Sequence, residues 1–223
     1  MPVTSPDPAA VAAALLDIEA VHIRPAEPFT FTSGRLSPVY VDCRKIISFP
    51  AERSLVLNQM AVTIARAIGV DAIDAIAGGE TAGIPYAAWL ADRLGKPMLY
   101  VRKKPKGFGR NAQIEGSFAP GARVLLVEDL ATDGGSKRVF VEALRAADAV
   151  VTDTLVVFFY QAGASAVGPL DDIGVRLLSL ATWTDILAVA ERTGRKTAAE
   201  LDQVRAFLND PAAWSAAHGG PAI

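Results

Sequence analysis

The sequence has few of the residues that form covalent cross-links or metal centres. Cys43 is the only cysteine among 223 residues, and the two histidines, His22 and His218, lie far apart. An intrachain disulfide and a four-cysteine zinc cluster are therefore excluded, and we expect no histidine pair that holds a metal. The single cysteine favours a reducing compartment.

Long apolar runs and an excess of one charge are also missing. No segment approaches the roughly 18–20 uninterrupted apolar residues of a spanning helix, and residues 1–14 lack the basic and apolar start of a secretory signal. The net charge is −2, so the chain has no overall positive field to hold a nucleic acid or an anionic membrane. We expect a cytoplasmic protein without nucleic-acid or membrane partners.

The composition is typical of a folded globular protein. Hydrophobic residues make up 51% of the chain and charged residues 21%, which excludes disordered and collagen-like classes. The length fits one domain with small additions. We therefore expect a single domain over 1–223, with a small N-terminal hood at about 20–45, a core at about 50–180, C-terminal helices at about 182–209 and a loose end from Pro211.

Strand and helix patterns alternate along the core. Continuous apolar runs at 124–127 and 155–159 are typical of strands that are covered on both faces. The pattern predicts an α/β protein with a central, mostly parallel sheet flanked by helices and a small N-terminal hood. The expected strands are 72–77, 97–101, 123–128, 150–159 and 175–180; the expected helices are 7–20, 50–68, 82–94, 136–146, 182–193 and 197–209; the hood is a hairpin of 29–32 and 39–42.

The segment 124–137 combines an apolar strand, two acids and a small-residue loop that opens a helix. In an open parallel sheet, ligands bind at the carboxyl ends of the strands. Small residues at a helix N-terminus let several N–H groups point at one anion. Glu128 and Asp129 would repel a phosphate, so ribose hydroxyls, directly or through hydrated Mg²⁺, suit them better. We expect a sugar phosphate here, with its phosphate held by Thr132, Asp133, Gly134, Gly135 and Ser136.

A second loop is strongly basic. Residues 102–110 contain five cations within nine positions of a chain that is acidic overall. Such density is self-repelling unless an anion neutralises it, and the glycines Gly107 and Gly109 favour a loop able to close over a polyphosphate. A solvated basic loop would have the same composition, but it would not explain the nearby acid pair and phosphate loop.

Two common nucleotide motifs do not fit. The order Gly135-Ser136-Lys137 reverses that of a Walker A loop, and Glu80 stands where the dinucleotide fingerprint needs its second glycine. Kinase and dehydrogenase functions are therefore not supported.

The segment 124–136 resembles the phosphoribosyl pyrophosphate (PRPP) signature of the type I phosphoribosyltransferases. The basic loop, in the form Arg-Lys-x-x-Lys with glycines after it, is similar to the catalytic loop of the orotate phosphoribosyltransferase family. The segment 29–42 resembles that family's hood over orotate, and 78–85 resembles its pyrophosphate loop. Together these resemblances span about residues 15–185 in the family's order.

The resemblance implies a glycosyltransferase that moves the phosphoribosyl group of PRPP to orotate, giving orotidine 5′-monophosphate and pyrophosphate in pyrimidine biosynthesis. It implies a homodimer in which the basic loop comes from the neighbouring subunit, and Mg²⁺ held mainly by PRPP, with Asp129 as a possible ligand. The implied catalytic residues are Lys106 and Asp129; PRPP is bound by Arg102, Lys103, Lys106, Glu128, Asp129 and residues 132–136; orotate is bound by Tyr40, Thr132 and Tyr160.

The chain departs from the family at three positions. Thr32, Ala82 and Tyr160 stand where many members have lysine, lysine and arginine, so PRPP binding is better supported than the identity of the base. A phosphoribosyltransferase for another nucleobase and a PRPP-binding regulator without turnover therefore remain alternatives.

Overall fold

The protein is described from a computed structural model, which covers residues 5–31, 33–105, 113–163 and 168–222. Its centre is a six-stranded sheet in the order β10-β9-β8-β5-β6-β7, in which only the edge pair β6 and β7 is antiparallel. The predicted α/β class with a mostly parallel sheet is confirmed. The strands are β5 (Ala75–Gly79), β6 (Met98–Val101), β7 (Ile114–Glu115), β8 (Val124–Ala131), β9 (Asp153–Phe159) and β10 (Arg176–Thr182).

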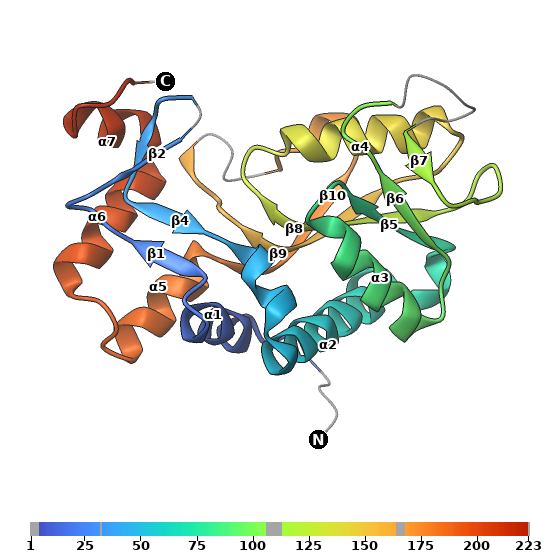
Figure 1. Cartoon of the computed structure of the whole chain (residues 1–223), viewed down its shortest axis with the longest axis horizontal. Helices are drawn as coiled ribbons and strands as arrows, with labels where there is room; N and C mark the ends of the chain where they lie inside the picture. Colours follow the sequence, from blue (N-terminus) through green and yellow to red (C-terminus); the bar gives the residue numbers. More distant parts are fainter. Residues whose placement is uncertain (1–4, 32, 106–112, 164–167, 223) are drawn as a thin grey trace.

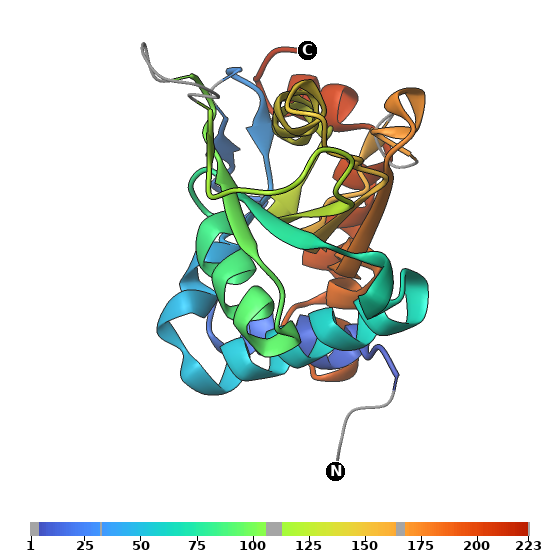
Figure 2. The same cartoon turned by 90° about the vertical axis from the view of Figure 1, so that its right-hand side faces the viewer.

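Helices cover both faces of this sheet (Figure 1, Figure 2). Helices α1 (Pro8–Asp17), α2 (Pro50–Ala67) and α3 (Gly83–Leu94) pack on one face, and α4 (Gly135–Ala146) packs on the other. Because strand side chains alternate, Leu125 and Val127 of β8 enter the larger core beneath α1–α3, whereas Leu126 enters the core beneath α4. Both faces of β8 are therefore buried, as its unbroken apolar run predicts.

The hood forms two small antiparallel pairs rather than the predicted hairpin. Strand β1 (Val21–Ile23) pairs with β4 (Val39–Val41), and β2 (Phe29–Thr30) pairs with β3 (Leu36–Ser37). The prediction that 29–32 pairs with 39–42 is wrong, because the Gly34 turn is tight enough to return β2 onto β3 directly. The 3₁₀-helix η1 (Cys43–Ser48) then leads to α2.

The predicted loose end is also wrong, because α5 (Trp183–Arg192) and α6 (Ala198–Asn209) are followed by α7 (Pro211–Ala217). The Asp210 carboxylate accepts a hydrogen bond from the Ala213 N–H, and Pro211 occupies the first helical turn. Trp214 is buried against Phe207. This helix supports the hood, since the Ser215 hydroxyl accepts a hydrogen bond from the Leu36 N–H at 3.1 Å.

The short elements η2 (Val70–Ala72) and η4 (Asp171–Ile173) complete the described structure. Within the described ranges, none of the helices combines the length and apolar character needed to cross a membrane.

Candidate active site

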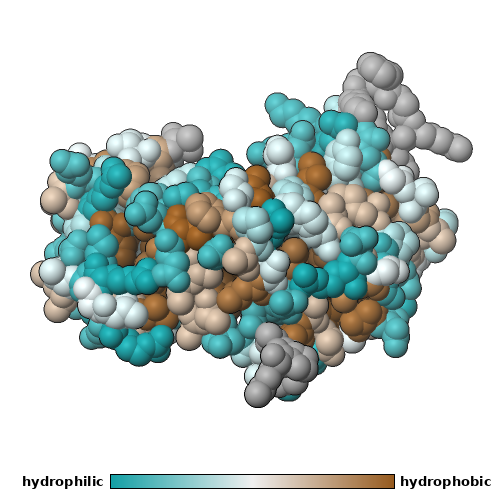
Figure 3. Space-filling model, turned by 60° about the horizontal axis from the view of Figure 1, so that its bottom comes forward, coloured by the Kyte–Doolittle hydropathy of each residue, from teal (hydrophilic) through white to brown (hydrophobic). Residues whose placement is uncertain are grey.

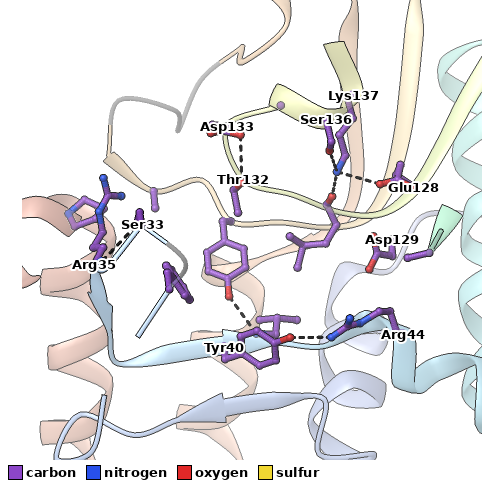
Figure 4. A pocket seen from close by; sticks show the side chains of 18 of the residues that line it. Ser33, Arg35, Tyr40, Arg44, Glu128, Asp129, Thr132, Asp133, Ser136 and Lys137 are labelled. Carbon is purple, nitrogen blue, oxygen red and sulfur yellow. Dashed lines mark hydrogen bonds and ion pairs between the residues drawn. The ribbon is translucent and has the colours of Figure 1, made fainter. Parts of the chain in front are cut away.

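A cleft of about 840 Å³ opens between the hood and the carboxyl ends of the central strands. The loops after β5, β6 and β8 meet there, as the parallel topology predicts, and the hood lies across from them (Figure 4). Most of the predicted site residues border this cleft: Tyr40, Lys103, Glu128, Asp129, Thr132, Asp133, Gly134, Ser136 and Tyr160.

The other predicted site residues are placed differently. Arg102 and Gly135 do not border the cleft. Arg102 lies beside it, where its guanidinium donates to the Glu115 carboxylate at 2.9 Å and to the Tyr100 hydroxyl at 2.8 Å. Lys106 and Thr32 lie outside the described residues.

The two acids of the pair have different surroundings because strand β8 continues to Ala131, three residues beyond its predicted end. Glu128 is only 5% exposed. Its Oε1 accepts a hydrogen bond from the Gly83 N–H at 3.0 Å, and its Oε2 lies 3.3 Å from Lys137 Nζ. Asp129 instead faces the cleft, and no side chain among the described residues forms a hydrogen bond or ion pair with its carboxylate.

Burial changes the protonation of both acids. It raises the pKa of Asp129, although Lys137 counteracts part of this effect. It also raises the pKa of Glu128 to about 7, against the opposing influence of Lys137 and the Gly83 N–H. A carboxyl whose pKa is higher in the folded than in the unfolded state destabilises the fold as pH rises through that interval.

We therefore expect the free energy of unfolding to fall as pH rises from Glu128's ordinary pKa of 4.5 to about 7. Between about pH 5 and about pH 8, the parent should lose roughly 2–3 kcal/mol more than the non-titrating variant Glu128→Gln. Urea denaturation of both proteins across this range measures the difference. Parallel curves for the two proteins would contradict a raised pKa at Glu128.

The predicted phosphate loop joins β8 to α4 through a left-handed residue. Gly134 has φ +79°, and a Cβ there would lie 2.9 Å from Leu170 Cδ2, so glycine is required. The Asp133 carboxylate accepts a hydrogen bond from the Gly135 N–H at 3.0 Å and is contacted by the Thr132 hydroxyl at 3.4 Å. The α4 N-terminus thus borders the cleft, while the Gly135 N–H donates within the loop.

The predicted pyrophosphate loop packs tightly behind the acid pair. A Cβ on Gly79 would lie 2.4 Å from the Phe140 ring, and one on Gly83 would lie 2.4 Å from the Val127 carbonyl oxygen. The glycines therefore allow this loop and β8 to approach at backbone distance. Glu80 lines the cleft, and its carboxylate accepts a hydrogen bond from the Lys103 N–H at 2.8 Å.

The hood contributes aromatic and cationic side chains that the sequence motifs only partly predicted. The Tyr40 hydroxyl accepts a hydrogen bond from Arg44 at 2.8 Å, and the Tyr40 ring stacks on His22. Arg44 also pairs with Asp42 at 2.6 Å, yet 57% of its side chain remains exposed on the Asp129 side of the cleft (Figure 4). Arg35 lines the cleft as well.

Sequence motifs did not identify Arg44 and Lys137 as site residues. Arg44 lies in a 3₁₀-helix that no local pattern marked, and Lys137 follows the motif as an ordinary first-turn cation. The signal in the sequence was the placement of these cations near acids. Arg44 follows Asp42 by two positions, and Lys137 ends the segment that contains the acid pair.

Tyr160 connects the sheet to the hood. It is 6% exposed, its ring packs edge-on against Phe158 and Trp183, and its hydroxyl accepts a hydrogen bond from the Val41 N–H at 3.1 Å. The residue that stands at the family's arginine position therefore borders the cleft and also fixes strand β4 above it.

Removing this hydroxyl should loosen the hood. In Tyr160→Phe the buried Val41 N–H loses its acceptor, so we expect the free energy of unfolding to fall by about 1–2 kcal/mol. Urea denaturation measures the loss, with Tyr40→Phe as the control because, among the described residues, its hydroxyl forms a hydrogen bond with the exposed Arg44 side chain and with no buried backbone group. Equal stability of Tyr160→Phe and the parent would show that the hydroxyl does not secure the hood.

Comparisons with known proteins relate the chain to one group of enzymes. It is 56% identical over 200 residues to the orotate phosphoribosyltransferase of Cereibacter sphaeroides strain KD131, covering 90% of this chain and 86% of that one. No protein-family model matches the chain.

Solved structures of enzymes with the same name also align with this chain. The orotate phosphoribosyltransferase of Aeropyrum pernix aligns with TM-score 0.66 and 34% identity over 82% of this chain and 99% of that one. The Mycobacterium tuberculosis enzyme, solved in complex with PRPP, aligns with TM-score 0.62 and 26% identity over 81% of this chain and 99% of that one.

Proposed function

The chain belongs to the orotate phosphoribosyltransferase family, and we propose that the cleft beneath the hood is where its reaction takes place. The protein is a pentosyltransferase that transfers the phosphoribosyl group of PRPP to orotate, giving orotidine 5′-monophosphate and pyrophosphate in pyrimidine biosynthesis. The observation that carries the placement is Asp129, a carboxylate that faces the cleft beside the phosphate loop and has no side-chain partner among the described residues.

The cleft has an anionic and an anion-binding side, as PRPP requires. We assign the ribose hydroxyls to Asp129 and the 5′-phosphate to the loop 132–136 at the α4 N-terminus. Binding of the phosphate at Gly135 requires its N–H to leave the Asp133 carboxylate. The loop would then exchange an internal acceptor for the ligand.

The leaving pyrophosphate belongs on the β5–β6 side of the cleft. Lys103 borders the cleft there, whereas Arg102 must exchange Glu115 for the ligand in order to contribute. Lys106 completes the proposed set as the catalytic cation, on the family resemblance alone. These cations would neutralise the charge that develops on the leaving oxygens.

Magnesium fits this arrangement as a substrate-bound ion. The described residues contain no cluster of three or more His, Cys, Asp or Glu side chains able to enclose a metal. Mg²⁺ commonly binds through one or two carboxylates together with substrate phosphates, and Asp129 is a cleft carboxylate without a side-chain partner among the described residues. When bound, the ion would neutralise pyrophosphate charge, while Asp129 orients the ribose.

Orotate would lie beneath the hood, between Tyr40 and Tyr160 and near Thr132. All three residues border the cleft. The orotate carboxylate needs a cationic partner, and we propose that Arg44 replaces the family's orotate-binding arginine, whose position Tyr160 occupies here. Its guanidinium offers further donors beyond those used by Asp42 and Tyr40.

The resulting mechanism is mainly electrostatic. As the orotate nitrogen attacks C1′ and pyrophosphate departs, positive charge grows on the ribose and negative charge on the leaving oxygens. Asp129 stabilises the first and the basic loop stabilises the second. The hood and the basic loop exclude water, which would otherwise hydrolyse PRPP.

A homodimer with shared active sites and a cytoplasmic location are parts of the same proposal. Ile47 and Phe49, on η1 and at the start of α2, are 38% and 36% exposed. Hydrophobic residues emerge as separate patches among hydrophilic ones on the face seen in Figure 3. Small separate patches are normal on a protein surface, so the homodimer rests on the family resemblance. A buried, unpaired Cys43 suits a reducing compartment.

Mixing two inactive variants tests the shared site. If Lys106 acts in the neighbouring subunit, Lys106→Ala and Asp129→Asn should complement each other after their subunits exchange. Each mixed dimer then holds one intact site, so an equal mixture should regain about one quarter of the parent's activity. No recovery despite proven subunit exchange would place the loop in its own subunit.

The reaction itself is tested by following orotate consumption in the presence of PRPP and Mg²⁺, with adenine, hypoxanthine and uracil in parallel. Turnover of orotate alone is expected. Turnover of another base, or PRPP binding without turnover of any base, would overturn the proposal.

Arg44→Leu should raise the KM for orotate more than the KM for PRPP if Arg44 holds the orotate carboxylate.

A further inference from the structure

Glu128 borders the cleft, but both oxygens of its carboxylate are engaged with other parts of the chain. Oε1 accepts from the Gly83 N–H at 3.0 Å, and Oε2 faces Lys137 Nζ at 3.3 Å. The side chains of Glu128 and Lys137 are each 7% exposed. Gly83 opens α3, so Glu128 satisfies one of the N–H groups that a helix start leaves unpaired.

Lys137 is similarly engaged with the chain. Besides Glu128, its ammonium group donates to the Leu130 carbonyl oxygen and contacts the Ser136 hydroxyl at 3.3 Å (Figure 4). A lysine has three N–H donors, and these three acceptors account for them. Lys137 therefore ties the end of β8 to the first turn of α4, on both sides of the phosphate loop.

The two sets of contacts share one ion pair. Through Glu128 the pair reaches the start of α3, where the pyrophosphate loop ends, and through Leu130 and Ser136 it reaches the phosphate loop. The missing Cβ atoms of Gly79 and Gly83 allow this approach, since each Cβ would lie within 2.8 Å of Glu128 Oε1. One buried contact thus links the loops at opposite ends of the PRPP site.

We propose that Lys137 and Glu128 are positioning residues that hold the phosphate loop and the pyrophosphate loop at a fixed separation, and that Asp129, the acid without a side-chain partner among the described residues, is the one that acts on the sugar. This differs from the sequence-based expectation that Glu128 contacts PRPP. It rests on the proposed function, because it assumes that the two loops bind the two ends of PRPP.

The decisive comparison is between Glu128→Gln and Asp129→Asn. If Glu128 only positions the loops, Glu128→Gln should keep kcat within about threefold of the parent while the KM for PRPP rises about tenfold. Asp129→Asn should lower kcat instead. An equal loss of kcat in both variants would show that Glu128 acts on the sugar and would overturn the proposal.

Lys137→Met tests the other half of the pair. It should weaken PRPP binding about tenfold or more, measured by calorimetry with PRPP and Mg²⁺ well below the melting temperature. Arg138→Met is the matched control, because Arg138 is the next residue of α4 and its ion pair with Asp172 lies away from the cleft. PRPP affinity equal to that of the control would leave Lys137 with a purely structural role and would overturn the proposal.

Lys137→Met leaves Glu128 buried without its partner, so the double variant with Glu128→Gln guards against a failure to fold. The neutral pair should restore the melting temperature, while PRPP affinity stays low because the link to Leu130 is absent. Recovery of both the melting temperature and the PRPP affinity would contradict a positioning role. The calorimetric readout needs no turnover, so it stays informative even if the parent fails to consume orotate, the outcome that would overturn the proposed function instead.

Discussion

Asp129→Asn is expected to lower kcat for orotate by about 10²–10³-fold, the usual effect of losing one charge contact in a transition state. The carboxylate faces the cleft, and burial raises its pKa, so the surrounding protein stabilises its negative charge only weakly. A positive ribose would supply the missing partner in the transition state. Asparagine keeps the shape and one acceptor oxygen but removes that charge.

The same substitution should not destabilise the fold. Because the pKa of Asp129 is raised, its ionised form lowers stability at neutral pH, and asparagine removes that effect. Thermal unfolding should therefore show a melting temperature equal to or above that of the parent. Asp153→Asn is the control for a lost strand carboxylate. Asp153 begins β9, pairs with Arg176 and does not border the cleft, so this variant should retain kcat. A kcat for Asp129→Asn within a fewfold of the parent would remove Asp129 from the mechanism.

Gly83→Ala should be among the most destabilising single changes in the chain. Its Cβ would lie 2.4 Å from the Val127 carbonyl oxygen and 2.5 Å from Glu128 Oε1. The Val127 carbonyl oxygen belongs to the backbone in the middle of the sheet, so it cannot move without disturbing the pairing with β5 and β9. We expect a loss of about 3 kcal/mol or more in the free energy of unfolding, together with most of the activity.

Gly95→Ala at the other end of α3 is the matched control. Gly95 has φ +64° and nothing within 4 Å of its missing Cβ, so alanine there meets only the backbone penalty. That penalty is about 1–2 kcal/mol. In urea denaturation, the free energy of unfolding of Gly83→Ala should be clearly lower than that of Gly95→Ala. Equal losses of this free energy would show that α3 can shift away from β8.

The part of the site that the sequence predicts is the part that is continuous in the chain. The apolar run, the acid pair and the loop from Thr132 to Ser136 follow one another, and the end of a parallel strand is where ligands bind. Sequence order alone therefore located Asp129 at the cleft. The length of β8 was missed, because two adjacent acids usually mark the end of a buried strand, whereas here Leu130 and Ala131 continue the pairing with β9.

The remainder depends on partners that are distant in sequence. Tyr160 meets the Val41 N–H across 119 positions, and no local pattern encodes that meeting. Lys137 is buried only because the Glu128 carboxylate and the Leu130 carbonyl oxygen lie where its ammonium group ends. A lysine in the first turn of a helix is ordinarily solvated, so its sequence position gave no sign of burial.

The hydrogen bond between the Leu36 N–H and the Ser215 hydroxyl has a consequence for synthesis on the ribosome. It spans 179 positions, so strand β3 lacks this partner until residue 215 has left the exit tunnel. The central sheet can pair earlier, because its last strand ends at Thr182. The orotate side of the cleft is therefore the last part of the enzyme to mature, and a nascent chain could bind a phosphate before it could enclose a base.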